Sequence, residues 1–300
     1  MKYHIIILTI AFAYSCGSSK QTIADNSTEN KEQVAVVTEK EMVDEPEKTM
    51  EMKDTEKASD PKEMSKEEMK DTMDKDDAME KDNTTPEAFD HNLWNTLLQS
   101  HVSDAGNVDY KAFKSDASKL RAYIDLLSTN MPNDGWSRED KLAYWINAYN
   151  ALTVDLIIRN YPLNSIKDIK NPWDQRLWKL GEKWYNLNEI EHQILRKMDE
   201  PRIHFAIVCA SFSCPKLQNT SFTASNLEGQ LTDATKTFLA DNNRNNISAN
   251  SLQLSKIFKW FSKDFKTNGS VIDFIDLYTD VDISPNAKKT YKTYNWDLND

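Results

Sequence analysis

Glycine is scarce in this sequence, with only six in 300 residues. Phosphate-binding loops and dinucleotide fingerprints need closely spaced glycines, because their backbone must turn tightly and approach the ligand. The sequence contains no such loop, no paired-histidine zinc motif and no internal repeat. A nucleotide-binding domain is therefore disfavoured, and we predict no cofactor and no bound metal.

Aromatic residues are missing from residues 17–88, which contain no Phe, Trp or Tyr. Residues 31–83 alone hold 19 acidic and 10 basic side chains. Such a composition cannot bury enough apolar surface to offset the entropy lost on ordering. We therefore predict a disordered acidic tether over residues 17–88. Its seven methionines could ligate a soft metal such as copper, but their irregular spacing and the absence of histidine make this the weaker interpretation.

The excess of negative charge is concentrated in that tether. From residue 84 onward the chain has 27 acidic and 25 basic residues, so the net charge of −11 is a property of the tail. Clustered basic residues with interleaved aromatics, the usual footprint of a nucleic-acid binder, are absent from the sequence. We therefore expect no nucleic-acid partner.

Long hydrophobic runs are also lacking, and the apolar run at residues 5–13 is too short to span a bilayer. Following a basic start, it is typical of a signal peptide. Ser15 and Gly17 flank Cys16 as in a bacterial lipoprotein cleavage site, although Tyr14 is an imperfect fit. We predict a signal peptide over residues 1–16 and a lipidated Cys16 that anchors the chain to a lipid bilayer of the cell envelope, at its periplasmic or outer-membrane face. An ordinary signal peptide cut nearby is the alternative.

Aromatic residues return at Phe89, so we predict a globular domain over residues 89–300. Apolar periodicity predicts helices and short extended pieces. The expected helices cover residues 89–101, 117–127, 137–160, a segment from Asn188 onward, 225–239, 257–265 and 271–278, and extended pieces are expected around a turn at 181–183, at 246–254 and at 291–298. The helix at 137–160 is apolar nearly all round and should be central. The fold class predicted is α+β, a single mixed domain with a central buried helix packed on a small sheet.

The stretch from Arg202 to Pro215 holds both cysteines of the domain and one of the five histidines. Its first part is apolar and rich in β-branched residues, which predicts a buried strand over residues 203–209 leading into a loop. In a strand, His204 and Cys209 point to opposite faces. Cys214 lies beyond the strand in a loop of small residues, so it is the preferred candidate for a reactive thiol.

A catalytic constellation can be built on this loop. If the loop folds back, Cys214 could act as nucleophile and His204 as base, while Glu191 or Asn147 orients the imidazole. Glu191 qualifies because it falls within the apolar arc of its predicted helix, where 100° per residue places it between Met198 and Leu195.

Structural interpretations of the same residues stay open. Cys209 and Cys214 are five residues apart and could form a disulfide in an exported protein, or Cys209 could be an inert core thiol. His204 could be a structural histidine, and Glu191 could cap its helix. Asn147 and the neighbouring Asn150 could pin nearby backbone, which is the interpretation we favour for both, because a buried amide needs partners.

Four segments together resemble the domain-of-unknown-function family 547 (DUF547). They are YWINAYNAL at 144–152, IEH at 190–192, RIHFA at 202–206 and SCP at 213–215, within a resemblance that covers about residues 93–278. The resemblance implies no assigned activity, and an α+β core similar to papain or transglutaminase would fit the residues. The order departs from those folds, since Cys214 follows His204 and the central helix carries Asn147 where a cysteine is expected.

Two functions are therefore predicted for the domain. The first is a thiol-dependent hydrolase or acyl-transferase that acts on an amide or thioester through Cys214, His204 and Glu191. The alternative is a non-catalytic envelope binding module for an unknown peptide or envelope component, in which the same side chains brace the core.

Overall fold

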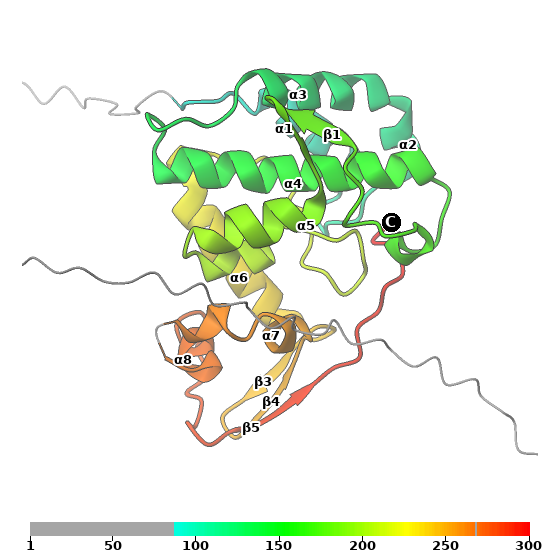
Figure 1. Cartoon of the computed structure of the whole chain (residues 1–300). Coiled ribbons are helices and arrows are strands. Elements are labelled where there is room, and N and C mark those ends of the chain that lie inside the picture. Colours follow the sequence, from blue (N-terminus) through cyan, green and yellow to red (C-terminus); the bar gives the residue numbers. More distant parts are fainter. Residues whose placement is uncertain (1–86, 268) are drawn as a thin grey trace, which may run out of the picture. The chain divides into compact units, whose positions relative to one another are not determined.

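Helices and two small sheets build an α+β domain in this computed structural model, which describes residues 87–267 and 269–300 (Figure 1). All of these residues belong to one compact unit. The predicted signal peptide with Cys16 and the predicted tether up to residue 86 lie outside the described residues. None of the helices in the described part is long and apolar enough to cross a membrane.

The helices are α1 (Asn92–His101), α2 (Tyr110–Ser115), α3 (Ala117–Thr129), α4 (Arg138–Asn160), α5 (Leu187–Glu189), α6 (Leu227–Ala240), α7 (Ile257–Trp260) and α8 (Val271–Asp276). Short 3₁₀ turns cover Ile166–Asp168, Leu195–Lys197, Pro201–Phe205, Ala224–Asn226 and Asp264–Lys266, and a single π-helical turn covers Ile190–Ile194. Strands β1 (Trp178–Leu180) and β2 (Lys183–Tyr185) form an antiparallel hairpin. Strand β4 (Ser251–Leu254) pairs antiparallel with β3 (Asn246–Ser248) and parallel with β5 (Lys288–Tyr291).

Helix α4 is the centre of the domain, as predicted. Ser137 caps its first turn by accepting a hydrogen bond from the Asp140 N–H, and every residue from 142 to 158 is buried. A helix that is apolar all round must be covered on all sides. Its main neighbours are α2, α3 and the turns of residues 187–197, so helices take the place of the sheet that we expected beneath it.

Two buried asparagines of α4 hold later segments of the chain. The Asn147 side chain donates to the Phe222 carbonyl (2.7 Å) and accepts from the Phe222 N–H (3.0 Å). The Asn150 side chain donates to the Ala206 carbonyl (2.9 Å) and accepts from the Val208 N–H (3.0 Å). Both amides thus pin neighbouring backbone, the structural interpretation that we favoured from the sequence.

The strand predicted over residues 203–209 is wrong. Residues Pro201–Phe205 form a 3₁₀ turn, and the chain then runs irregularly past Cys209. The Glu200 side chain caps this turn by accepting from the Arg202 N–H, and Pro201 fixes a helical φ at its start. Asn150 gives the backbone of Ala206 and Val208 the partners that a neighbouring strand would have supplied. The apolar, β-branched composition of residues 203–209 correctly predicted that residues 203–208 are buried, but it did not predict the conformation of the segment.

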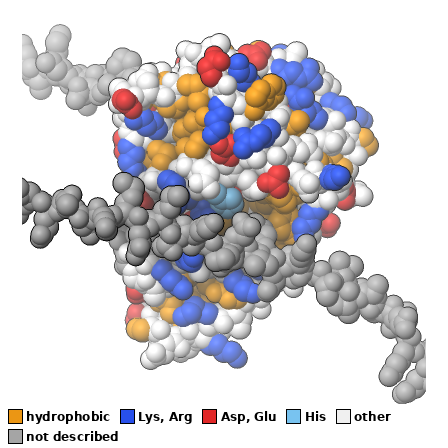
Figure 2. Space-filling model, viewed as in Figure 1, with side chains coloured by type: hydrophobic (Ala, Val, Ile, Leu, Met, Phe, Trp, Pro, Cys, Tyr) orange, Lys and Arg blue, Asp and Glu red, His pale blue; other side chains and the backbone are white. Residues whose placement is uncertain are grey.

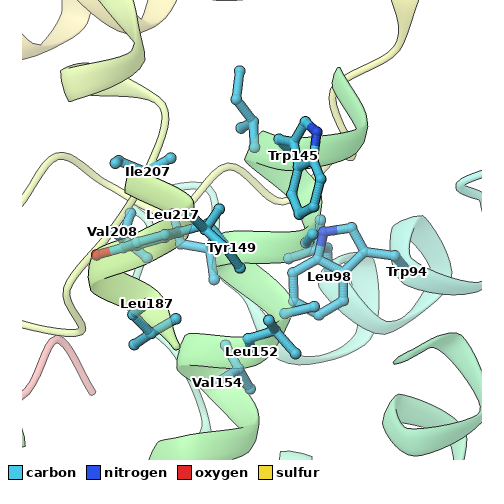
Figure 3. Close-up of a cluster of buried hydrophobic side chains, with 14 of the residues drawn as sticks. Trp94, Leu98, Trp145, Tyr149, Leu152, Val154, Leu187, Ile207, Val208 and Leu217 are labelled. Carbon is cyan, nitrogen blue, oxygen red and sulfur yellow. The ribbon is translucent and has the colours of Figure 1, made fainter. Parts of the chain in front are cut away.

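Two hydrophobic clusters make up the core. The first surrounds α1 to α4, and Figure 3 shows part of it, including Trp94, Leu98, Trp145 and Tyr149. The second joins the end of α6 with β4, α7 and α8. Trp296 packs against both clusters. The segment that carries it is attached by β-bridges from Asp297 to Ser165 and from Leu298 to Ser211, so the candidate site described next lies where the clusters meet.

Candidate functional site

Cys209 and Cys214 form a disulfide, with their Cα atoms 6.3 Å apart. Of the alternatives left open by the sequence, this is the one that the structure contains. A sulfur bonded to sulfur has no thiolate, so Cys214 cannot act as a nucleophile in this oxidised form. The expectation of a free Cys214 thiol is therefore wrong for the structure described, because the loop after Cys209 turns back and brings the two sulfurs together.

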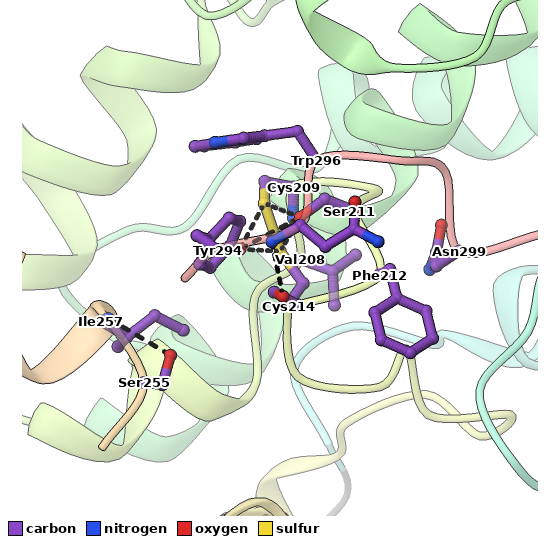
Figure 4. The surroundings of a disulfide bond; sticks show 12 residues. Val208, Cys209, Ser211, Phe212, Cys214, Ser255, Ile257, Tyr294, Trp296 and Asn299 are labelled. Atoms are coloured by element: carbon purple, nitrogen blue, oxygen red, sulfur yellow. Dashed lines mark hydrogen bonds between the residues drawn. A yellow bond between two sulfur atoms is a disulfide. The ribbon is translucent and has the colours of Figure 1, made fainter. Parts of the chain in front are cut away.

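The two sulfurs differ in their surroundings (Figure 4). Cys209 is partly exposed, whereas Cys214 is 3 % exposed. The Cys214 Sγ accepts a hydrogen bond from the Cys209 N–H (3.0 Å) and from the Tyr294 hydroxyl (3.1 Å). The Ser211 hydroxyl donates to the Tyr294 hydroxyl (3.0 Å). A hydroxyl has one hydrogen, so the hydrogen bonds run in one direction: Ser211 donates to Tyr294, and Tyr294 donates to the buried Cys214 sulfur.

His204 lies in a different hydrogen-bonded set. Its Nε2 is 2.8 Å from Asp264 Oδ2, and its ring stacks on Phe261 with a centroid separation of 4.0 Å. Burial lowers the pKa of His204 in spite of the neighbouring carboxylate, which favours the neutral ring with Nε2 as the donor to Asp264. In the part of the chain that the structure describes, no hydrogen bond joins His204 to a cysteine sulfur.

Asp264 links His204 to two further residues that the sequence did not identify. Arg196 donates to both oxygens of Asp264, from Nε (2.7 Å) and from Nη2 (2.8 Å). Burial alone would raise the pKa of Asp264, but the hydrogen bonds from Arg196 and His204 outweigh it and hold that pKa below its usual range. Arg196 also bonds His192 at Nδ1 (3.0 Å), and burial lowers the pKa of His192 to about 4.

Glu191 points inward, as predicted. The Tyr149 hydroxyl donates to Glu191 Oε2 (3.0 Å), and burial raises the pKa of this carboxyl to about 7. A role in capping is ruled out by the local geometry, because the helix cap lies two residues before the Asn188 predicted from the sequence. Asn186 is the cap, and its side chain accepts from the Glu189 N–H. A carboxyl that is partly protonated at neutral pH is of the kind used for proton transfer.

A row of aromatic side chains runs past the disulfide. Trp296 is in ring contact with Trp173 (5.9 Å) and Trp260 (5.9 Å), and Phe261 follows Trp260 along the chain. We call Trp173, Trp260, Phe261 and Trp296 the aromatic strip, and all four are partly exposed. In Figure 2, hydrophobic side chains and one histidine lie together in the middle of the face shown.

The aromatic strip is connected to the groups beneath it. Tyr294 packs on Trp296 (4.5 Å) and Trp260 (4.9 Å), so the donor to the buried sulfur also supports the strip. Trp173 lies beside the hydroxyl of Tyr149, which bonds Glu191. The Lys167 ammonium lies 4.3 Å from the centroid of the Trp296 ring, in cation–π geometry.

The four side chains predicted to act together are thus divided among four hydrogen-bonded sets. Cys214 is with Tyr294, His204 with Asp264, Glu191 with Tyr149, and Asn147 with Phe222. Arg196 could have been identified from the sequence, because it lies one helical turn after His192. Asp264 lies 60 residues from His204, Tyr294 lies 80 residues from Cys214 and Trp296 lies 36 residues from Trp260, and no local pattern marks them. Among the described side chains, no group of three or more His, Cys, Asp or Glu could hold a metal ion.

Comparison with known proteins gives one finding for this region. A family model described as "Protein of unknown function, DUF547" matches residues 133–239. The match covers α4, Glu191, His204 and the disulfide loop, and it confirms the resemblance predicted from the sequence. No curated protein and no solved structure gave a match.

Proposed function

A model of the DUF547 family matches residues 133–239, and from that premise we propose that the chain is an exported, lipid-anchored protein of the bacterial cell envelope. Its domain binds a peptide segment of an envelope partner through the aromatic strip. The observation that carries this proposal is the Cys209–Cys214 disulfide. It favours a compartment outside the cytosol, and it leaves no free thiol at these two cysteines for nucleophilic catalysis.

The disulfide supports export. Such bonds form and persist in oxidising compartments outside the bacterial cytosol. The apolar run at residues 5–13 and the Cys16 that follows it would take the chain there and supply a site for acylation. These two indications are independent, since one comes from the domain and the other from the N-terminal sequence.

The composition of the aromatic strip supports binding. Tryptophan, tyrosine and arginine are the residues that most often carry the binding energy of protein interfaces. Here three tryptophans lie in ring contact, Tyr294 packs beneath them, and Arg196 lies 5.3 Å from the ring centroid of Phe261. Because these contacts already fix the rings, little side-chain entropy remains to be lost when a partner docks.

The thiol-dependent hydrolase is the second candidate. It would require reduction of the disulfide and movement of His204 away from Asp264 toward Cys214. That movement would leave a neutral histidine donor unpaired and remove one of the hydrogen bonds that stabilise the Asp264 carboxylate. The structure offers the aromatic strip without any rearrangement, and we therefore place binding first.

A peptide array made from exported proteins tests the proposal. We expect Trp260→Ala to weaken binding at least about tenfold, as loss of an interface hot spot does. The matched control is Trp184→Ala, which removes an exposed tryptophan of β2, outside the strip. Equal binding by the Trp260→Ala chain and the wild type would contradict the proposal. Release of amide or thioester products by the reduced wild type, but not by Cys214→Ala, would favour the hydrolase instead.

A further inference from the structure

We infer that the Cys209–Cys214 disulfide is not a passive brace but exchanges with a pair of thiols on an exported polypeptide, with Cys209 as the attacked sulfur and Cys214 as the leaving sulfur. The inference rests on the proposed function for the docking of that polypeptide. Its chemistry rests on the loop geometry alone.

The first argument is the unequal exposure of the two cysteines. A thiolate attacks a disulfide sulfur from outside, so the attacked atom must be reachable. Cys209 is partly exposed, whereas Cys214 is almost fully buried. Cys209 Sγ also lies 3.2 Å from the hydroxyl oxygen of Tyr294, which supports the aromatic strip, so a peptide docked on the strip would lie near this sulfur.

The second argument is the set of donors around the sulfur that would leave. The Cys209 N–H and the Tyr294 hydroxyl both point at Cys214 Sγ, at 3.0 and 3.1 Å. Sulfur in a disulfide is a weak acceptor, but a thiolate is a strong one. These two donors therefore gain strength only when the S–S bond breaks, which favours departure of Cys214 as a thiolate.

The local backbone supports the same assignment. The Arg244 guanidinium, which also pairs with Asp241, donates from Nε to the Cys214 carbonyl (2.7 Å) and so fixes the backbone of the leaving cysteine. Ala210, between Cys209 and Ser211, has a φ of 56°, a left-handed conformation that alanine rarely adopts. Such conformations are retained mainly where a site requires them.

The exchange balances as two displacements. A partner thiolate attacks Cys209 Sγ, a new S–S bond forms, and the electron pair of the old bond goes to Cys214 Sγ, which the two donors stabilise. The second partner thiolate then attacks the partner sulfur of the mixed disulfide, and Cys209 leaves and takes up a proton. The partner dithiol is oxidised to a disulfide, and Cys209 and Cys214 are reduced to thiols. The direction is set by the relative reduction potentials of the two pairs.

The direct test uses the full chain with Cys16→Ser, so that only the two domain sulfurs react. The folded protein is incubated with a synthetic peptide that carries two cysteines, and products are followed by mass spectrometry. We expect one peptide disulfide for each domain disulfide reduced, with an unchanged circular dichroism spectrum. A bond that resists the peptide until the domain unfolds would overturn the inference.

Single-cysteine variants test which sulfur is attacked. In the same background, Cys214→Ser leaves Cys209 without its partner, and we expect it to form a stable mixed disulfide with an activated single-cysteine peptide. Cys209→Ser leaves only the buried Cys214 and should react at least about tenfold more slowly, because access limits the attack. The reverse order of rates would overturn the assignment.

A third variant tests the donors. Tyr294→Phe removes one hydrogen bond to the leaving thiolate, and we expect reduction by dithiothreitol to slow about tenfold. Tyr291→Phe, the same change on an exposed side chain of β5, is the control and should react as the wild type does. Equal rates for both variants would count against the role of Tyr294.

The outcomes separate this inference from the proposed function. If peptides bind through Trp260 but the disulfide resists dithiols, exchange is wrong and binding stands. If dithiothreitol reduces the folded protein with the Tyr294 dependence described but no peptide depends on Trp260, the exchange chemistry stands and the docking surface is wrong.

Discussion

Glu191 is the residue whose burial has the clearest energetic consequence. Its pKa is raised by burial from 4.5 to about 7. Between those values the folded state binds more protons than the unfolded state, so the free energy of unfolding falls as pH rises through this window. Above pH 7 the carboxylate is buried in ionised form, with the Tyr149 hydroxyl as one of its hydrogen-bond donors.

Glu191→Gln should remove this pH dependence. We expect the wild type to lose up to roughly 3 kcal/mol of unfolding free energy through this group between pH 5 and pH 8, a loss that the variant lacks. Urea titrations at both pH values measure the difference. Glu182→Gln, which changes a side chain that is 99 % exposed, is the control. The same pH dependence in the wild type and in Glu191→Gln would contradict the prediction.

Asn150 shows what a single buried amide contributes. Replacing it with Ala leaves the buried Ala206 carbonyl and Val208 N–H without these partners, and we expect a loss of about 3 kcal/mol in unfolding free energy. Asn160→Ala, at the exposed end of the same helix, should change stability by less than about 1 kcal/mol. Denaturant titration of both variants is the measurement, and similar losses would show that Asn150 is not special.

At the scale of elements, the sequence predicted features that depend on neighbouring residues and missed those that depend on residues far apart in the chain. Helix α4 was predictable from Ser137 to Asn160, because its cap and its apolar positions are local signals. Glu191 was predictable as inward-facing for the same reason. The conformation of residues 203–209 was not, since it is set by Asn150, more than 50 residues earlier in the chain. The pairing of His204 with Asp264 was equally hidden, because only the tertiary fold brings them together.

Gly106, in the loop between α1 and α2, and Gly229, in α6, should respond in opposite ways to replacement by alanine. Gly106 has a φ of 86°, and an added Cβ would lie 2.2 Å from Lys216 Cβ. Gly106→Ala should therefore destabilise the domain, by about 2 kcal/mol or more. Gly229 lies in α6 with no atom within 4 Å of an added Cβ, so Gly229→Ala should stabilise it by about 1 kcal/mol. Thermal and urea unfolding measure both, and a shift of the same sign would contradict this contrast.

For the whole molecule, the division of charge supports the proposed anchoring. The 31–83 region is strongly acidic and the chain from residue 84 is nearly neutral, so electrostatic attraction to an anionic bilayer is not expected from either part. Attachment would therefore depend on acyl chains, whose burial in the bilayer contributes about 0.8 kcal/mol for each CH₂ group.

Cys16→Ala is the test of that attachment. Cells grown with a fatty-acid analogue should label the wild type and not the variant, because Cys16 is the proposed acylation site. Ser15→Ala keeps the cysteine and a small residue before it, so it should still be labelled. Labelling of the Cys16→Ala chain would show that the anchor lies elsewhere or that the analogue marks another group.

Tyr294 and Trp296 complete the site from the C-terminal end of the chain, and this has a consequence for biogenesis. Residues 294–299 are synthesised after every element they touch, yet they contact the disulfide loop, Ser165 and Val108. A polypeptide crossing a membrane from its N-terminus would expose Cys209 and Cys214 before Tyr294 arrives. Oxidation of the pair could then precede closure of the loop. On the proposed export route, the oxidants outside the cytosol would therefore meet these cysteines in an open precursor rather than in the finished domain.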